Sequence, residues 1–279
     1  MHGARAPPYP APVQLAAVLA ALEDDYPPAL AEQWDAVGLV CGDPAAEVRR
    51  VLFAVDPVQA VAEEALATGV DLLVTHHPLY LRGTSSVAAT TPKGRLVHAL
   101  VRGGCALYVA HTNADRAAPG VSDALAALFD LRETVPLQPH AAGSATGLGR
   151  VGDLPVPLPV GELVELAARV LPRTAWGVRA AGDPALVVRR LAVSGGAGDA
   201  LLHAAAASGA QAFLTSDLRH HPAAEAPEGL ALLDAAHWAT EWPWLPGAAA
   251  RLAERTGLPT AVSRLVTDPF HLSSRSPRA

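Results

Sequence analysis

Cysteine is scarce in this sequence of 279 residues, which contains only two. Cys41 and Cys105 lie far apart among apolar or small residues, and neither belongs to a CxxC or CxxH motif. This usage argues against a disulfide framework and against a cysteine-based zinc site. We therefore expect two buried thiols in a protein of the reducing cytoplasm.

Positive charge and long apolar runs are scarce as well. The net charge is −6 and no stretch is rich in lysine and arginine, so an extended nucleic-acid footprint is not favoured. No uninterrupted apolar run approaches the ~18 residues that a membrane-spanning helix needs. The apolar segment 15–22 has the spacing of a helix and no cleavage site of small residues, which argues against secretion. We expect no nucleic-acid partner and no membrane partner.

The residues that are present indicate a globular α/β protein. Hydrophobic residues make up 51% of the chain and charged residues 17%. An apolar strand at 51–55 is followed by Asp56-Pro57, which is typical of a helix start, and Gly69 ends the helix before a second apolar strand at 72–74. Such alternation of strands and helices predicts mainly parallel sheets.

One βα pattern occurs twice along the chain. Arg50 corresponds to Arg190 and Thr75 to Thr215, a constant offset of 140 positions, and segment 103–115 corresponds to 229–241 at an offset of 126. The alternative is convergence on ordinary βα sequence. We interpret the pattern as duplicated βα units that form two similar, intimately packed halves. The predicted halves are residues 1–150, with His76, His77, His111 and Asp115, and residues 151–279, with His237 and Glu241, separated by the proline-rich stretch 152–159.

The candidate functional side chains share one placement, because each group directly follows a predicted strand, where α/β proteins gather active groups. Imidazole and carboxylate ligands suit Zn, Fe or Mn, and a bridging carboxylate can hold two ions. Alone, a His-His pair is usually structural and a His/Glu pair four residues apart is usually a surface ion pair. Three such groups at equivalent strand ends favour a metal site instead. The groups are His76-His77 after 72–74, His111 and Asp115 after 106–110, and His237 and Glu241 after 230–233.

Three further residues occupy the second copy's counterpart of His76-His77. They are Asp217, His220 and His221, and Ser216 stands in place of one histidine. We expect them to line the pocket or to support the ligands.

An ordered set of motifs over nearly the whole chain resembles the Ngg-interacting-factor-three-like family, also known as dinuclear metal-centre hexamer proteins and as type-two GTP cyclohydrolase I homologues. Departures from the family pattern are Ala36, Ser216 and Ala236. The motifs are Trp34-Asp-Ala-Val-Gly-Leu39, Gly42-Asp43, Thr75-His-His-Pro78, His111-Thr-Asn-Ala-Asp115, Ser194-Gly-Gly196, Thr215-Ser-Asp217 with His221, His237-Trp-Ala-Thr-Glu241 and Thr267-Asp-Pro-Phe270.

The resemblance implies a site for two divalent metal ions and a homo-hexamer. The implied ligands are His76, His77, Asp115, His237 and Glu241, and His111 would lie beside them as a catalytic acid or base.

A two-metal site can activate water for hydrolysis, so the leading hypothesis is a metal-dependent hydrolase of a small molecule. GTP cyclohydrolase-like ring opening follows from the resemblance, and phosphoester or amide hydrolysis stays open. The sequence has no GxxxxGK[ST] loop, which weakens a specific nucleotide assignment. The alternative is a metal-storage, metal-delivery or regulatory interaction protein without catalysis.

Overall fold

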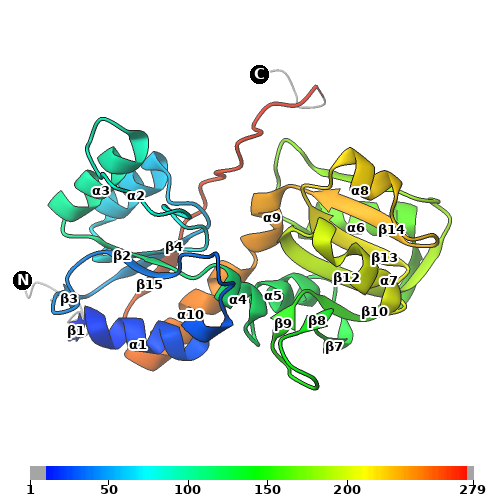
Figure 1. Cartoon of the computed structure of the whole chain (residues 1–279), viewed down its shortest axis with the longest axis horizontal. Coiled ribbons are helices and arrows are strands. Elements are labelled where there is room, and N and C mark those ends of the chain that lie inside the picture. The colour runs from blue at the N-terminus through cyan, green and yellow to red at the C-terminus, as the bar shows by residue number, and fades with distance from the viewer. Residues whose placement is uncertain (1–10, 275–279) are drawn as a thin grey trace, which may run out of the picture. The chain divides into compact units, whose positions relative to one another are not determined.

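The structure is a computed structural model that describes residues 11–274 (Figure 1). Its contacts divide the chain into two compact units. Unit 1 comprises residues 1–111 and 246–265, and unit 2 comprises residues 112–245 and 266–279. Among the described residues, no helix is long and apolar enough to cross a membrane.

Unit 1 is built on a five-stranded sheet in the order β15-β4-β5-β6-β2, in which only the β2–β6 pairing is antiparallel. Leu52, Leu73 and Leu107 on its strands pack with apolar residues of α2 and α3 in one buried cluster. Figure 1 shows α1 and α10 on the other side of the sheet. The elements are α1 (Leu15–Asp25), β2 (Gly38–Cys41), β4 (Val51–Ala54), α2 (Gln59–Thr68), β5 (Leu72–Thr75), α3 (Pro92–Arg102), β6 (Ala106–Val109), α10 (Trp244–Thr256) and β15 (Thr260–Val262), and a separate pair joins β1 (Val13–Gln14) to β3 (Glu47–Val48).

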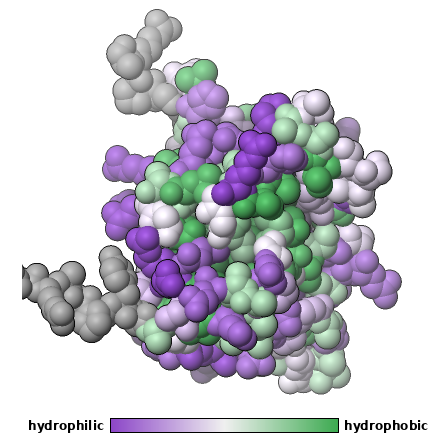
Figure 2. All heavy atoms as spheres, turned by 90° about the vertical axis from the view of Figure 1, so that its left-hand side faces the viewer, coloured by the Kyte–Doolittle hydropathy of each residue, from purple (hydrophilic) through white to green (hydrophobic). Residues whose placement is uncertain are grey.

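The face that Figure 2 views is mixed in polarity. Figure 2 shows apolar residues gathered between strongly polar ones on the face that it views. Val58 and Val101 are among the exposed apolar side chains of unit 1. Exposed apolar residues of this kind are common on soluble domains and carry no argument alone.

The predicted helix signals were right at α3 and partly wrong at α2. Thr91 caps α3, because its Oγ1 accepts a hydrogen bond from the Gly94 amide at 3.0 Å, and Pro92 takes the first turn. Helix α2 instead begins at Gln59, after Val58. The N-cap is Val58, which makes no side-chain cap hydrogen bond, and the Asp56 carboxylate lies 2.6 Å from His77 Nδ1. Gly69 ends α2 in the left-handed conformation, as predicted.

Unit 2 is built on a six-stranded sheet in the order β11-β14-β13-β12-β10-β7. Its central strands β12, β13 and β14 are parallel, and the other pairings are antiparallel. Helices α5 and α6 pack on one face, and α7 and α8 on the other. The elements are α4 (Thr112–Arg116), α5 (Val121–Ala127), β7 (Arg132–Val135), β10 (Arg150–Pro159), α6 (Val160–Val170), β11 (Val178–Ala181), β12 (Val187–Ala197), α7 (Leu202–Ala207), β13 (Ala212–Ser216), α8 (His220–Ala224), β14 (Ala231–Ala235) and α9 (His237–Glu241), with a small pair β8 (Gln138–Pro139) and β9 (Gly147–Leu148).

The proline-rich stretch 152–159, which was expected to separate the two halves, lies in a strand of the unit 2 sheet. It belongs to β10, which pairs with β12 on one side and with β7 on the other. The register to β12 breaks between Asp153 and Leu158, where Pro155 and Pro157 lie. Proline supplies no amide hydrogen to a ladder, so the strand keeps its place in the sheet only with this irregularity.

The strand register follows the sequence repeat. Val51 pairs with Leu72 in unit 1, and Leu191 pairs with Ala212 in unit 2, so both members of the pair are 140 positions apart. The third strands differ slightly: Leu72 pairs with Ala106, whereas Ala212 pairs with Ala231, one residue earlier than an offset of 126 places it. The halves 1–150 and 151–279 stay a prediction, and the contact units follow other bounds because 112–150 packs with unit 2 and β15 joins the sheet of unit 1.

Candidate metal centre

Unit 1 brings together three of the histidines that the sequence singled out. One ring nitrogen from each of His76, His77 and His111 lies within 4.8 Å of the others, and the three could hold a metal ion. The ring centroids are 5.2 Å apart for His76 and His77 and 5.3 Å apart for His76 and His111. They meet because β5 and β6 are adjacent and parallel, with Thr75 opposite Val109, so both strands deliver their next residues to one sheet edge.

Each of these three imidazoles is fixed through its Nδ1 atom. The acceptors are the Ala110 carbonyl at 2.9 Å from His76 and the Asp56 carboxylate at 2.6 Å from His77. Asp35 does the same for His111, at 2.8 Å. An acceptor on Nδ1 keeps the proton there and leaves the Nε2 lone pair for a metal, which is the usual arrangement of metal-binding histidines.

Sequence reasoning missed the part that Asp35 and Asp56 play. Asp56 was interpreted as a helix cap, although its place after β4 puts it at the sheet edge where His77 follows β5. Asp35 was seen only as part of the motif that begins at Trp34, and it comes to His111 from 76 positions away. The signal that could have found Asp56 was its position at a strand end beside a histidine.

Unit 2 joins His237, Glu241 and Asp217 in one hydrogen-bonded group. His237 Nδ1 lies 2.7 Å from Asp217 Oδ2, and its Nε2 lies 2.9 Å from Glu241 Oε1. The single turn of α9 places His237 and Glu241 on one face, as their spacing predicted. Sequence analysis expected Asp217 to line the pocket or support the ligands, and it is the residue that fixes Nδ1 of His237.

The charge of Glu241 raises the pKa of His237 to about 11, against the lowering effect of burial and with help from Asp217. Glu241 itself is buried. Without a metal ion, His237 therefore keeps its proton between two carboxylates near neutral pH. Metal ligands must be deprotonated, so a bound cation would take the place of that proton.

Gly196 makes room for this pair. Its φ is +65°, and a Cβ atom there would lie 2.6 Å from Glu241 Oε1 and 3.1 Å from His237 Nε2. The Gly196 amide donates a hydrogen bond to Thr240 Oγ1 at 2.9 Å, which ties β12 to α9. The double glycine of the Ser194-Gly-Gly196 motif thus lets the backbone pass close to the candidate ligands.

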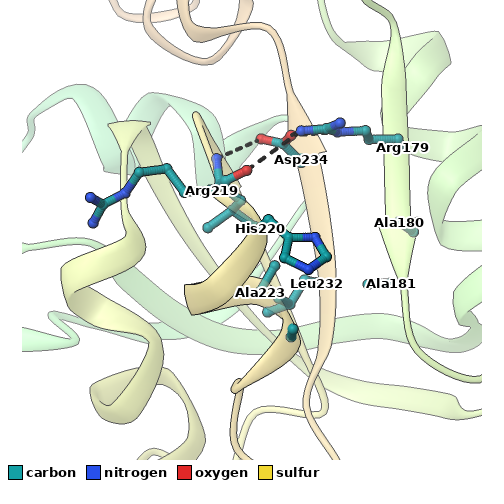
Figure 3. Close-up of a pocket in the computed structure, with 10 residues that line it drawn as sticks. Arg179, Ala180, Ala181, Arg219, His220, Ala223, Leu232 and Asp234 are labelled. Carbon is teal, nitrogen blue, oxygen red and sulfur yellow. Dashed lines mark hydrogen bonds and ion pairs between the residues drawn. The ribbon is translucent and has the colours of Figure 1, made fainter.

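The remaining predicted residues have different places in unit 2. Asp115 lies half-buried in α4. His220 and His221 are exposed on α8, with ring centroids 5.2 Å apart. His220 lines a cavity of about 410 Å³, shown in Figure 3, in which Arg179 forms an ion pair with Asp234 at 2.6 Å. The lining of that cavity includes none of the predicted metal ligands.

The donor set fits a divalent transition metal. Neutral imidazoles and buried carboxylates suit Zn, Fe and Mn, and the carboxylate or carbonyl on each Nδ1 atom supplies the orientation that such ligands need. The candidate ligands of unit 1 are imidazoles, and those of unit 2 are His237, Glu241 and Asp115.

A family model described as Duf34/NIF3 (NGG1p interacting factor 3) matches residues 13–269. A Streptomyces coelicolor protein named GTP cyclohydrolase 1 type 2 homolog is 57% identical to this chain over 272 residues, covering 94% of this chain and 95% of the relative. A Mycobacterium tuberculosis protein of the same name is 38% identical over 376 residues, covering 95% of this chain and 99% of the relative.

Solved structures of similar fold cover nearly the whole chain. A Staphylococcus aureus hypothetical protein has a TM-score of 0.84 at 26% identity, covering 94% of this chain and 100% of its own. Reduced HcgD from Methanocaldococcus jannaschii has a TM-score of 0.75 at 28% identity, covering 91% of this chain and 99% of its own. A Bacillus cereus protein related to NIF3 shares the fold, with a TM-score of 0.85 at 23% identity over 93% of this chain and 99% of its own.

Proposed function

Because this chain belongs to the Duf34/NIF3 family, we propose that it holds two divalent metal ions and uses them to hydrolyse a small molecule. The proposed ligands are His76, His77, Asp115, His237 and Glu241, with Zn, Fe or Mn as the metal.

The observation that carries the proposal is the orientation of four imidazoles. His76, His77, His111 and His237 each have Nδ1 fixed by a carbonyl or a carboxylate. Histidines that only pack or pair at a surface have no need of this shared arrangement. Metal-binding histidines do, because the second nitrogen must point its lone pair at the ion.

The residues of this chain would divide the work of hydrolysis. When bound, a pair of divalent ions lowers the pKa of a water molecule toward neutrality and polarises the electrophile. His111 is the proposed acid or base: Asp35 holds its Nδ1 proton, so its Nε2 can take a proton from the attacking water and return it to the leaving group. Asp35 is then the residue that positions His111.

The name of the relatives makes GTP cyclohydrolase-like ring opening the first reaction to test, followed by phosphoester and amide hydrolysis. We also propose a cytoplasmic homo-hexamer, which rests on the family resemblance. Light scattering on the purified chain tests the hexamer separately from the chemistry.

The function is tested by metal analysis together with turnover of GTP, a phosphodiester and an amide. We expect two metal ions per wild-type chain, and loss of metal and turnover in His76→Ala and in Glu241→Ala. His203→Ala is the matched control, since His203 is an exposed histidine of α7, and it should keep both. Full metal content and turnover in His76→Ala would contradict the proposal.

A further inference from the structure

Unit 1 contains a cavity of about 670 Å³ that His77 helps to line. This volume is in the range of sites that take small organic molecules. Its walls come from three segments: the start of α2, the residues after β5 and the first turns of α3. Pro57, Val58, Pro78, Leu79, Pro92 and Leu96 make much of the lining apolar.

Two cations, Lys93 and Arg95, lie at this cavity on the exposed side of α3. Lys93 Nζ lies 5.6 Å from the centroid of the Tyr80 ring, a cation–π contact that holds the ammonium group near the cavity. Arg95 makes one long hydrogen bond, from Nη1 to the Thr90 carbonyl at 3.5 Å, so its guanidinium has further N–H donors for a ligand.

Lys93 and Arg95 have no carboxylate partner in the part of the chain that the structure describes. Over residues 11–274 no carboxylate forms an ion pair with Lys93 or Arg95. The only carboxylate in the lining is Asp56, and it is engaged by His77 Nδ1 at 2.6 Å. The cavity therefore combines apolar walls, a positive side and a neighbouring candidate metal ligand.

From this combination we infer that the cavity binds an organic anion with an apolar body. The anionic group, a phosphate or a carboxylate, pairs with Lys93 and Arg95, and the apolar body lies against Leu79 and Leu96 with one edge near His77. The inference rests on the proposed function, because it names the class of substrate that the metal centre would hydrolyse. Exposed cations alone bind anions weakly, so the apolar walls are what make a site here.

Lys93 offers a direct probe, since it is the only lysine of the 279 residues. Reductive methylation with carbon-13 formaldehyde keeps its charge and labels two amines, that of Lys93 and that of the N-terminus. We expect phenyl phosphate and benzoate to shift the Lys93 methyl signal saturably and to leave the N-terminal signal unchanged.

Two smaller probes separate the contributions of charge and apolar contact. Inorganic phosphate carries the charge without the ring, and phenol carries the ring without the charge. We expect each to bind the labelled protein at least tenfold more weakly than phenyl phosphate. Equal affinity for inorganic phosphate and phenyl phosphate would overturn the inference, because exposed cations alone would then explain the binding.

Substitution gives an independent readout by calorimetry on unlabelled protein. The double variant Lys93→Gln with Arg95→Gln should lower the affinity for phenyl phosphate at least tenfold. Arg102→Gln is the matched control, since it removes one exposed cation from the opposite end of α3, and it should bind as the wild type does. Unchanged affinity in the double variant would also overturn the inference.

The inference and the proposed function can fail separately. Binding of phenyl phosphate is measured on metal-stripped protein and on Glu241→Ala, where no turnover is expected. If the probe binds there through Lys93 and Arg95 but the loaded wild type hydrolyses nothing, only the proposed function fails. If the loaded protein hydrolyses a substrate but the probe does not bind, only the inference fails.

Discussion

At the scale of single residues, the decisive feature is a set of carboxylates that hold histidines without being predicted as ligands themselves. Asp35, Asp56 and Asp217 each face the Nδ1 atom of one histidine. Such partners fix both the tautomer and the direction of the ring. These carboxylates should therefore affect metal affinity through the histidines that they hold, without contacting the ion themselves.

Asp56→Asn should lower the affinity of the chain for Zn²⁺ or Mn²⁺ by about 10- to 100-fold. The amide keeps the shape of the side chain but no longer holds the proton on His77 Nδ1 by charge. Competition with a chelator of known affinity measures the change. Asp43→Asn is the control, because the Asp43 carboxylate accepts a hydrogen bond from a turn amide, Ala45 N, at 2.9 Å. Equal losses in both variants would refute a specific role for Asp56.

Gly196→Ala tests the close approach of backbone to the pair His237 and Glu241. A left-handed alanine costs about 1–2 kcal/mol in unfolding free energy, and here the new methyl group would also displace Glu241 Oε1. Gly177→Ala has the matched backbone cost, since φ is +69° and nothing lies within 4 Å of its Cβ position.

We expect both glycine variants to lose at least the backbone cost in urea unfolding and only Gly196→Ala to lose bound metal. Metal content measured on the two folded variants makes the comparison. If Gly196→Ala keeps its metal, the carboxylate of Glu241 is either free to move or not a ligand.

At the scale of helices and strands, local sequence rules predicted a helix start correctly where its residues have no partner from a distant part of the sequence. Thr91-Pro92 predicted the start of α3 correctly, whereas Asp56-Pro57 predicted the start of α2 two residues early. The difference is physical, because Asp56 contacts His77, which lies 21 positions away in the sequence. Local rules for helix starts do not take such a distant partner into account. The prolines of 152–159 suggested a boundary between two halves for a related reason. Pairing of β10 with β12 keeps these residues in a strand despite the low preference of proline for strands.

Thr91→Ala should lower the unfolding free energy by about 1 kcal/mol, the typical cost of a lost helix cap. The threonine hydroxyl accepts the Gly94 amide hydrogen, and alanine leaves that amide without it. Urea unfolding gives the difference. Thr90→Ala, at an exposed neighbouring threonine, is the control and should change stability little. An equal loss in both would mean that the cap contributes nothing.

At the scale of the whole molecule, the sequence predicted the α/β class, the parallel strands and the repeat offset that the register reproduces. Three of the predicted site residues, His76, His77 and His111, lie together within unit 1, and the metal-ligand set stays a prediction. It could not predict which segments share a unit, because the return of 246–265 to the first sheet depends on packing between distant parts of the chain.

Stability at high pH should depend on Cys105, one of the two thiols expected to be buried. Burial raises its pKa from 9.0 to about 12, with smaller contributions from Cys41 and Asp71. As pH rises above 9.0, the thiol loses its proton in the unfolded state but keeps it in the folded state. The unfolded state is therefore stabilised relative to the folded state. The contribution of Cys105 to the free energy of unfolding is therefore fully present below pH 9 and is lost between pH 9 and about 12.

The loss from this one thiol should approach a slope of about 1.4 kcal/mol per pH unit. Urea unfolding between pH 8 and about 9.5, where most of the unfolded tyrosine is still protonated because its pKa is near 10, measures it. Cys105→Ala should unfold more easily at every pH and with a shallower pH dependence. An identical slope in the variant would show that Cys105 does not titrate as stated.

Strand β15, Thr260–Val262, lies beside β4 at the edge of the first sheet, and its backbone pairs with a strand whose side chains are all buried. During synthesis on the ribosome, β15 emerges about 200 residues after β4. Until then, β4 has an open hydrogen-bonding edge, which is a template for aggregation. The nascent protein is thus exposed to misassembly at β4 until β15 has been made.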